Sequence, residues 1–249
     1  MRKSYLKPVI KCPGERHPFI SWVLENFPKD HAELKYCEPF CAGACVFLNK
    51  DVSAEETISD IDHGLICILK SLRDEPKEFI GRIKRTKFGE NAFQKAAKAS
   101  LSPIDDYVEK GINEYILRRM SRSGSKKAFF QGCETVWIKM LDNLSGVAKR
   151  IKNTNVICSP FKDMLKVWDE EDTFIYLNPP ALPGKNEEEH PDMTVDDHVA
   201  MLNLLKGARG KILVSGHSSP LYNCQLTNWK STKMTFAGSK KPEVLWRNY

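Results

Sequence analysis

The chain has 249 residues, of which 41% are hydrophobic and 28% are charged, a composition typical of a globular protein with a substantial core. No apolar run approaches the roughly 18 residues that a membrane-spanning helix needs, and the basic start lacks the apolar stretch of a secretory signal. We therefore predict no membrane association and a cytoplasmic, reducing location, with the eight cysteines serving as packing thiols.

Charge is distributed unevenly along the chain, which has a formal net charge of +6. Residues 81–127 hold twelve Lys and Arg against five Asp and Glu, whereas residues 169–197 hold ten acids and a single lysine. A basic segment of this kind indicates a polyanionic partner, and a solvated helical face is the alternative. No histidine pair lies near Cys37, Cys41 and Cys45 to complete a tetrahedral site, so no metal is predicted.

The first half of the chain predicts two strands and a long helical region. The segment "LKYCEPF" (34–40) is typical of a buried strand, and the turn "CAGA" (41–44) and a helix beginning at "CVFLNK" follow it. A second strand ends near Asp60, and an amphipathic helix then runs to Pro76. From about 77 to 150 the pattern is helical, interrupted by a loop at "RRMSRSGSKK" (118–127).

The second half returns to strands. "NTNVICSPF" (153–161), "DTFIYLNPP" (172–180) and "KILVSG" (211–216) have strand patterns, and "MTFAG" (234–238) with "EVLWRNY" (243–249) predicts a closing hairpin. Between them, Thr194 is placed to cap a helix with Asp196 and Asp197 in its first turn.

Strands that alternate with helices predict an α/β sheet. We assign 1–76 and 151–249 to the α/β domain and 77–150 to a helical insertion. Ligands of open α/β sheets bind beyond the carboxyl ends of the strands. Those ends fall here at the "CAGA" turn, at Asp60, at "CSPF" (158–161) and at "NPPA" (178–181).

Four segments together resemble a known family. "KPVIKCPGERHPF" is similar to K-W-x-G-G-K, "YCEPFCAGACVFL" to E-P-F-x-G-x-G-x-V-F, and "FIYLNPPALP" to Y-L-D-P-P-Y-L-P, and the ending "PEVLWRNY" also matches. In order and spacing they resemble the Dam-type (alpha-group) DNA adenine-N6 methyltransferases, which transfer a methyl group from S-adenosylmethionine to adenine. The resemblance covers nearly the whole chain. It implies a Rossmann-like methyltransferase sheet with a basic, helical target-recognition insertion.

The resemblance also implies a cofactor site, formed by Lys11, Gly14, Phe40, Ala42, Gly43, Ala44, Asp60, Pro160 and Phe161. Asp60 corresponds to the acid that holds the ribose hydroxyls. Ala42 and Ala44 replace two family glycines, and each alanine costs about 1–2 kcal/mol if its φ angle is positive. Pro160 replaces an acid and has no N–H to donate. We therefore expect no tightly bound cofactor.

The catalytic loop implied by the resemblance is Asn178, Pro179, Pro180 and Ala181. Asn178 replaces an aspartate and accepts hydrogen bonds without charge. Ala181 replaces an aromatic residue whose stacking on a flipped base is worth about 1–3 kcal/mol. With the changes in the cofactor motifs, these substitutions predict a degenerate loop.

The insertion carries DNA recognition in the family, and the resemblance therefore implies double-stranded DNA as a partner. The residues expected to contact DNA are Arg118, Arg119, Arg122, Lys126 and Lys127. Phe129 and Phe130 follow them, either as packing residues, which we favour, or as stacking partners for a base. The acidic stretch "KNEEEHPD" (185–192) is expected to be a solvated loop, with a partner-binding surface as the alternative.

Three functions remain open. The leading one is a DNA-binding pseudo-methyltransferase without catalytic activity and with impaired S-adenosylmethionine binding. The alternative is an active DNA adenine-N6 methyltransferase that uses S-adenosylmethionine. The third is a protein-interaction module on the same fold. The sequence leaves the DNA target and a cellular or viral source undecided.

Overall fold

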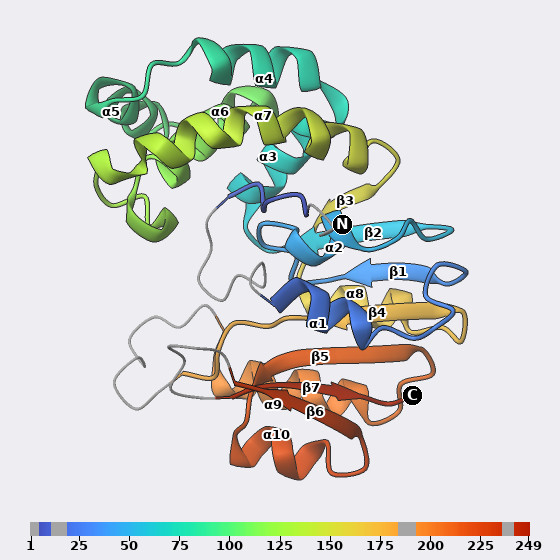
Figure 1. The fold of residues 1–249 in the computed structure, drawn as a ribbon. Coiled ribbons are helices and arrows are strands. Elements are labelled where there is room, and N and C mark those ends of the chain that lie inside the picture. Colours follow the sequence, from blue (N-terminus) through green and yellow to red (C-terminus); the bar gives the residue numbers. More distant parts are fainter. Residues whose placement is uncertain (1–4, 11–18, 184–192, 236–241) are drawn as a thin grey trace. The chain divides into compact units, whose positions relative to one another are not determined.

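The computed structural model of the chain describes residues 5–10, 19–183, 193–235 and 242–249. Its strands form one seven-stranded sheet in the order β3-β2-β1-β4-β5-β7-β6 (Figure 1). The strands are β1 (Lys35–Glu38), β2 (Glu56–Asp60), β3 (Asn155–Cys158), β4 (Thr173–Leu177), β5 (Lys211–His217), β6 (Lys230–Met234) and β7 (Glu243–Arg247). The order of the first five is that of a doubly wound Rossmann sheet.

The sheet is parallel through its centre and antiparallel at one edge. β1 pairs in parallel with β2 and β4, with Cys37 opposite Thr57 and Ile175, and β4 pairs in parallel with β5. β7 runs antiparallel to both β5 and β6, with Val214 opposite Trp246. The four predicted motifs follow the carboxyl ends of β1, β2, β3 and β4, at 41–44, at Asp60, at 158–161 and at 178–181.

The chain divides into two compact units, and each is described by itself. Unit 1 contains residues 1–20, 41–50 and 60–158, and unit 2 contains residues 21–40, 51–59 and 159–249. The helical segment 77–150, predicted to be an insertion, thus belongs to unit 1 together with β3 and the turn after β1. That it forms a separate domain stays a prediction.

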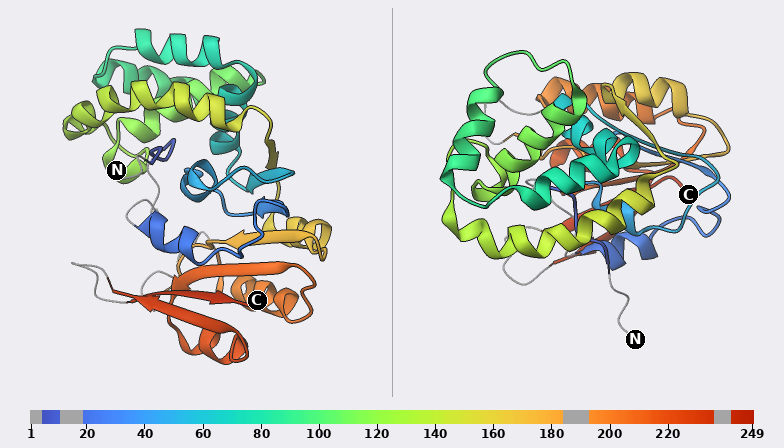
Figure 2. Two further views of the ribbon diagram at one scale, coloured as in Figure 1. Left: turned by 45° about the vertical axis from the view of Figure 1, so that its right-hand side comes forward. Right: turned by 90° about the horizontal axis from the view of Figure 1, so that it is seen from above.

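Unit 1 is built around the packing of α3 against α6, and α4, α5 and α7 surround this pair (Figures 1 and 2). Tyr115 of α6 is fully buried, and its ring contacts Phe79 and Trp137 with centroids 5.7 Å away in each case. The helices of unit 1 are α2 (Cys45–Asn49), α3 (His63–Asp74), α4 (Pro76–Arg85), α5 (Glu90–Ala99), α6 (Tyr107–Arg119) and α7 (Glu134–Ile151), with 3-10 turns at Arg122–Gly124 and Gln131–Cys133.

Unit 2 buries both faces of its central strands, whereas the edge strand β6 is largely exposed. On one face, Ile175, Leu177, Ile212 and Val214 pack against apolar residues of three helices. On the other, Phe27 packs edge-on to Phe174 with ring centroids 4.6 Å apart. β4 is buried along its whole length, as strands covered on both faces are. The helices of unit 2 are α1 (Ile20–Glu25, of which Ile20 falls in unit 1), α8 (Phe161–Trp168), α9 (Val195–Leu205) and α10 (Pro220–Gln225).

Most predicted elements are confirmed, including the two strands before residue 61 and the capped helix at Thr194. The prediction was wrong at Phe161, which begins α8 instead of ending a strand. The first strand of the closing hairpin lies at Lys230–Met234, before most of the predicted segment, part of which falls outside the described residues. In the parts of the chain that the structure describes, no helix is long and apolar enough to span a membrane.

Candidate functional site

The turn after β1 lies in unit 1 and keeps a glycine-type backbone although it carries two alanines. Ala42 has φ 41° and Ala44 has φ 58°, both in the left-handed region that favours glycine. Gly43, between them, is needed for space, because a Cβ there would lie 2.9 Å from Pro8 Cβ and 3.0 Å from the Ile10 oxygen. Alanines thus occupy the two positions where φ is positive, and glycine occupies the position where space is short.

Hydrogen bonds hold this turn in place. The Ala44 N–H donates to the Cys41 oxygen at 2.6 Å, and the Val9 N–H donates to the Gly43 oxygen at 3.0 Å. Ala44 is fully buried, whereas Ala42 is only partly buried. The Ala42 methyl group is therefore the one of the two that has solvent access.

Asp60, at the end of β2, braces the same turn. Its two carboxylate oxygens accept the N–H groups of Ala42 and Asp62, each at 3.0 Å. Burial raises the pKa of Asp60, and these backbone donors and the nearby Arg118 oppose that shift. Each oxygen retains a second lone pair, so this carboxylate can also accept the hydroxyl of a ligand. Lys11 and Gly14, predicted beside it, lie outside the described residues.

The cofactor-motif residues of unit 2 form an aromatic pair. Phe40 and Phe161 stack with centroids 5.3 Å apart and planes 29° from parallel. Pro160 is exposed immediately before α8, and its carbonyl oxygen accepts the N–H of Asp163 at 3.1 Å. The proline thus begins a helix but supplies no carboxylate where the resemblance implies one.

The predicted catalytic loop follows β4 in unit 2. The Oγ of Ser215 donates to Asn178 Oδ1 at 2.8 Å and lies 2.9 Å from the hydroxyl of Tyr176. Ser215 and Tyr176 are buried, so this short chain of hydroxyl groups fixes the Asn178 amide from the interior. Pro179 is buried, and Ala181 at the end of the loop is exposed.

A buried histidine, which sequence reasoning had not assigned to the site, lies behind this loop. His198 of α9 is fully buried, and its Nδ1 is 2.7 Å from the hydroxyl of Tyr222. Burial lowers the pKa of His198, and the Asp197 carboxylate and the backbone of Ala181 oppose that shift. The only signal in the sequence was a histidine in the first turn of a well-capped helix.

The five residues predicted to contact DNA separate into two groups. Arg122, Lys126 and Lys127 are exposed in the recognition loop, which we define as residues 121–130. Arg122 lies over the ring of Phe130, 5.3 Å from its centroid, and Phe129 packs against Phe88 at 5.4 Å. Packing is therefore the role of Phe129, whereas Phe130 is 40% exposed.

Arg118 and Arg119 differ from the prediction because both are buried, with exposed fractions of 8% and 3%. They belong to the last turn of α6 rather than to a loop. Arg119 Nε donates to the Val9 oxygen at 2.9 Å, and Arg118 forms ion pairs with Asp62 and Glu114. These guanidinium groups make their hydrogen bonds and ion pairs inside unit 1, and their contact with DNA stays a prediction.

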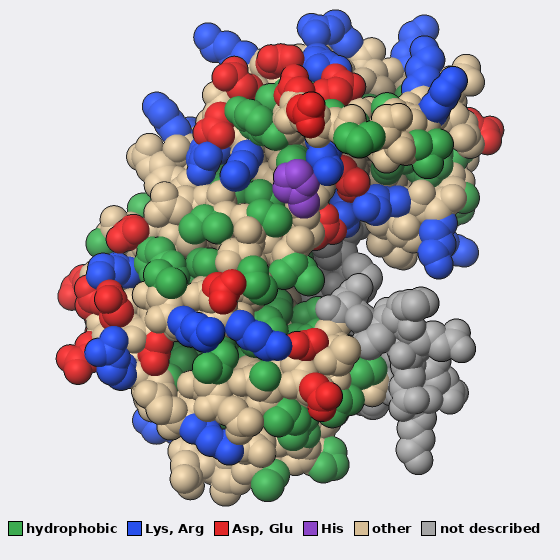
Figure 3. Space-filling view, turned by 180° about the vertical axis from the view of Figure 1, so that it is seen from behind, with side chains coloured by type: hydrophobic (Ala, Val, Ile, Leu, Met, Phe, Trp, Pro, Cys, Tyr) green, Lys and Arg blue, Asp and Glu red, His purple; other side chains and the backbone are tan. Residues whose placement is uncertain are grey.

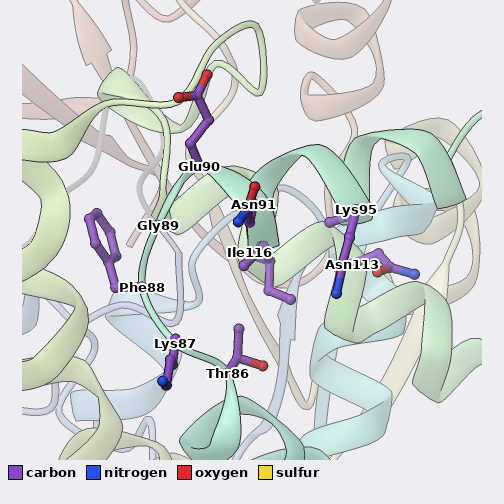
Figure 4. Close-up of a pocket in the computed structure, with 11 residues that line it drawn as sticks. Thr86, Lys87, Phe88, Gly89, Glu90, Asn91, Lys95, Asn113 and Ile116 are labelled. Atoms are coloured by element: carbon purple, nitrogen blue, oxygen red, sulfur yellow. The ribbon is translucent and has the colours of Figure 1, made fainter.

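A groove of about 630 Å³ lies elsewhere in unit 1, between the segment 86–89, α5 and α6 (Figure 4). Lys87 and Lys95 line it, but none of the predicted site residues does. Lys and Arg side chains are prominent over the helical part of unit 1 (Figure 3). Within the described ranges, no cluster of His, Cys, Asp and Glu is arranged to hold a metal ion.

The strand order makes this chain an α/β protein with a Rossmann-like sheet. The family model described as D12 class N6 adenine-specific DNA methyltransferase matches residues 13–223. The chain belongs to this family. The family resemblance and the fold class predicted from the sequence are thereby confirmed.

Two curated relatives are named as type II methyltransferases. M.MjaIII of Methanocaldococcus jannaschii is 26% identical over 203 residues, covering 72% of this chain and 70% of its own length. M.CviBI of Paramecium bursaria Chlorella virus NC1A is 20% identical over 218 residues, covering 84% of this chain and 82% of its own. Among solved structures, the rRNA methyltransferase aviRa of Streptomyces viridochromogenes has a TM-score of 0.42 and 13% identity, with 95% and 85% of the two chains covered.

These relatives favour the alternative function over the leading one. Both carry methyltransferase names, and neither comparison indicates that this chain has lost activity or cofactor binding. The inactivity inferred from Ala42, Ala44, Pro160 and Ala181 therefore stays a prediction. The possible partner-binding surface at 185–192 lies outside the described residues.

Proposed function

We propose that this chain is a DNA adenine-N6 methyltransferase that uses S-adenosylmethionine and works slowly for its family. The observation that carries the proposal is the hydroxyl chain of Tyr176 and Ser215 behind Asn178, with Ser215 Oγ 2.8 Å from the Asn178 amide oxygen. A buried polar group is costly unless it forms hydrogen bonds. The hydroxyl groups of Tyr176 and Ser215 bond to each other and to Asn178, and they thereby fix the loop residue that would contact the substrate. Membership of the family over residues 13–223 supports the same function.

The role of Asn178 follows from its hydrogen-bonding capacity. An amide oxygen has two lone pairs, so Asn178 can accept a hydrogen bond from the exocyclic amino group of adenine while Ser215 holds its side chain. Accepting this hydrogen bond makes the amino nitrogen more electron-rich, although less so than a carboxylate would. We therefore assign substrate orientation to Asn178 and expect a lower rate than an aspartate would give.

The residues present fit the methyl donor in part. Asp60 has acceptor capacity for ribose hydroxyls, and the turn that carries Ala42 and Ala44 keeps the backbone form that glycine favours. When bound, S-adenosylmethionine supplies an activated methyl group. Phe161 offers an aromatic surface in unit 2, whereas the side chain of Pro160 offers no acceptor, so we expect weakened binding rather than none.

A second function, DNA binding without catalysis, is favoured by one specific observation. Ala181 is exposed at the end of the loop and has no ring to stack on a flipped base. The loss of such stacking costs about 1–3 kcal/mol, which lowers the rate by one or two orders of magnitude. In that case the function that persists would be DNA binding through Arg122, Lys126 and Lys127.

Binding measurements on the purified chain separate the two functions. The enzyme should bind S-adenosylmethionine in a calorimetric titration and duplex DNA in a polarisation assay, and Asp60→Asn should weaken cofactor binding by about tenfold through the lost charge-assisted hydrogen bonds. Asp163→Asn, in the exposed first turn of α8, serves as the matched control. DNA binding without any cofactor binding would support the non-catalytic function and contradict our proposal.

A further inference from the structure

A continuous polar network inside unit 1 joins the recognition loop to the turn that carries Ala42. It begins at Lys126, whose Nζ lies 3.2 Å from Glu114 Oε2. Glu114 in turn accepts Arg118 Nε at 3.1 Å, and Arg118 Nη2 pairs with Asp62. The Asp62 N–H donates to Asp60, and Asp60 accepts the N–H of Ala42.

The centre of the network is buried and its outer end is accessible. The side chains of Arg118 and Glu114 are 10% and 12% exposed, whereas that of Lys126 is 38% exposed. A carboxylate this deeply buried is stable only while it is paired, so Glu114 depends on both of its cationic partners. A change at Lys126 therefore alters the surroundings of a buried charge.

The backbone around the network leaves Glu114 little freedom to move. A Cβ at Gly64, in the first turn of α3, would lie 2.5 Å from Glu114 Cδ, so the carboxylate packs directly on the start of that helix. Asp62 caps the same helix by accepting the Leu65 N–H at 3.0 Å. Lys126 has φ 61°, a left-handed conformation that costs a non-glycine residue about 1–2 kcal/mol and persists when its contacts fix it.

We propose that Glu114 and Arg118 are positioning residues that transmit the engagement of Lys126 by a DNA phosphate to the turn at Ala42. The inference takes its ligand, DNA, from the proposed function. The series of contacts from Lys126 to Ala42 does not depend on that function. A phosphate that takes Lys126 removes one of the two partners of Glu114, and Arg118 then shifts toward Glu114 and away from Asp62. With Asp62 released, the Asp60 contact with the Ala42 N–H is held less firmly.

The consequence is linkage between two ligands. If DNA loosens the turn that would contact the methyl donor, then the donor and DNA change each other's affinity by the same factor. Coupling of this kind is typically about 5- to 150-fold. The effect of losing the Lys126–Glu114 contact on the turn at Ala42 can be measured without phosphate or cofactor. Removal of the Lys126 charge should have the same effect as the binding of Lys126 to a phosphate.

Amide hydrogen exchange of the purified chain tests the inference directly. In Lys126→Met, exchange at the Ala42 and Asp62 amides should be about fivefold faster or more, at the lower end of that coupling range, while amides of α7 remain as in the wild type. Lys127→Met removes the neighbouring exposed charge and should leave Ala42 unchanged. Duplex DNA added to the wild type should accelerate exchange at Ala42, and it should not do so in Lys126→Met.

Other outcomes would overturn the inference. Equal exchange at Ala42 in Lys126→Met and Lys127→Met, or acceleration spread evenly over unit 1, would leave Glu114 and Arg118 with a structural role only. DNA that fails to bind, or binds without moving Ala42, would have the same consequence. If Lys126→Met accelerates Ala42 and DNA does the same, but the wild type transfers no methyl group, the proposed function fails and the positioning role stands.

Discussion

Ala42 and Ala44 adopt left-handed φ values, which cost alanine more than glycine. Backbone hydrogen bonds hold the turn that carries them. Such strain is retained when the surrounding structure fixes the conformation. Here Asp60 and the segment around Val9 do so.

Replacement of either alanine by glycine should therefore stabilise the chain. We expect Ala42→Gly to raise the free energy of unfolding by about 1 kcal/mol, because relief of the left-handed strain exceeds the added flexibility of the unfolded chain. Ala97→Gly, in the interior of α5, is the matched control and should lower it by about 1 kcal/mol. Denaturant unfolding measures the stability of both variants. A loss of stability in Ala42→Gly would contradict the claim that Ala42 is strained.

Ala181 gives a gain-of-function prediction. Ala181→Tyr should raise the rate of methyl transfer to DNA by about 5- to 150-fold, since stacking on a flipped base is worth about 1–3 kcal/mol. The position is exposed, so the larger side chain needs no repacking of the core. Ala54→Tyr, at another exposed position of unit 2, controls for added apolar surface. An unchanged rate in Ala181→Tyr would show that the loop does not meet the base.

His198 predicts how stability depends on pH. Burial lowers its pKa from the ordinary value of 6.5, so the unfolded chain takes up a proton more readily than the folded one. Its contribution to stability is therefore intact above pH 6.5 and falls as the pH drops below that value.

Unfolding by denaturant at pH 7 and pH 5 measures this effect. The wild type should lose more stability between the two values than His198→Gln does, because glutamine does not titrate. Tyr222→Phe, which removes the hydroxyl 2.7 Å from Nδ1 but keeps the histidine, should retain a pH-dependent loss. Identical losses in the wild type and His198→Gln would mean that His198 is not buried in its neutral form.

At the scale of elements, the end of α6 separates two kinds of arginine that look alike in the sequence. The run "RRMSRSGSKK" has the composition of a loop, yet the helix continues through its first two residues. Apart from Glu114, one helical turn before Arg118, the partners of those residues are Asp62 and the carbonyl oxygens of Pro8 and Val9, which are distant in the chain. No local pattern contains that information, so sequence reasoning assigned all five basic residues to one role.

This division predicts opposite effects for Arg119 and Arg122. Arg119→Met should lower the free energy of unfolding by roughly 2–4 kcal/mol, because buried charge-assisted hydrogen bonds are lost and carbonyl groups are left unpaired. It should leave the salt dependence of DNA binding unchanged. Arg122→Met should barely affect stability but should reduce the slope of log affinity against log salt by about 1. A reduced salt slope in Arg119→Met, with an unchanged slope in Arg122→Met, would show that Arg119 contacts DNA and Arg122 does not.

At the scale of the whole molecule, the sheet could be predicted because its strands carry their own signal. β4 is a run of apolar residues buried along its length, and the Thr194 capping box marks the start of α9. The site was predicted as a set of strand ends, which the order of β1, β2 and β4 supports. The groups that hold those ends, such as Ser215 behind Asn178, depend on strand neighbours and could not be found from a single sequence.

The central claim is that the Asn178 loop still orients adenine for methylation. The most direct test is to incubate duplex DNA with the wild-type chain and labelled S-adenosylmethionine, digest the DNA, and identify the labelled nucleoside by mass spectrometry. We predict N6-methyladenine, formed slowly by the wild type and reduced at least a hundredfold in Asn178→Ala, which deletes the acceptor. Labelled N6-methyladenine at the same level in both proteins, or none with the wild type, would contradict the claim.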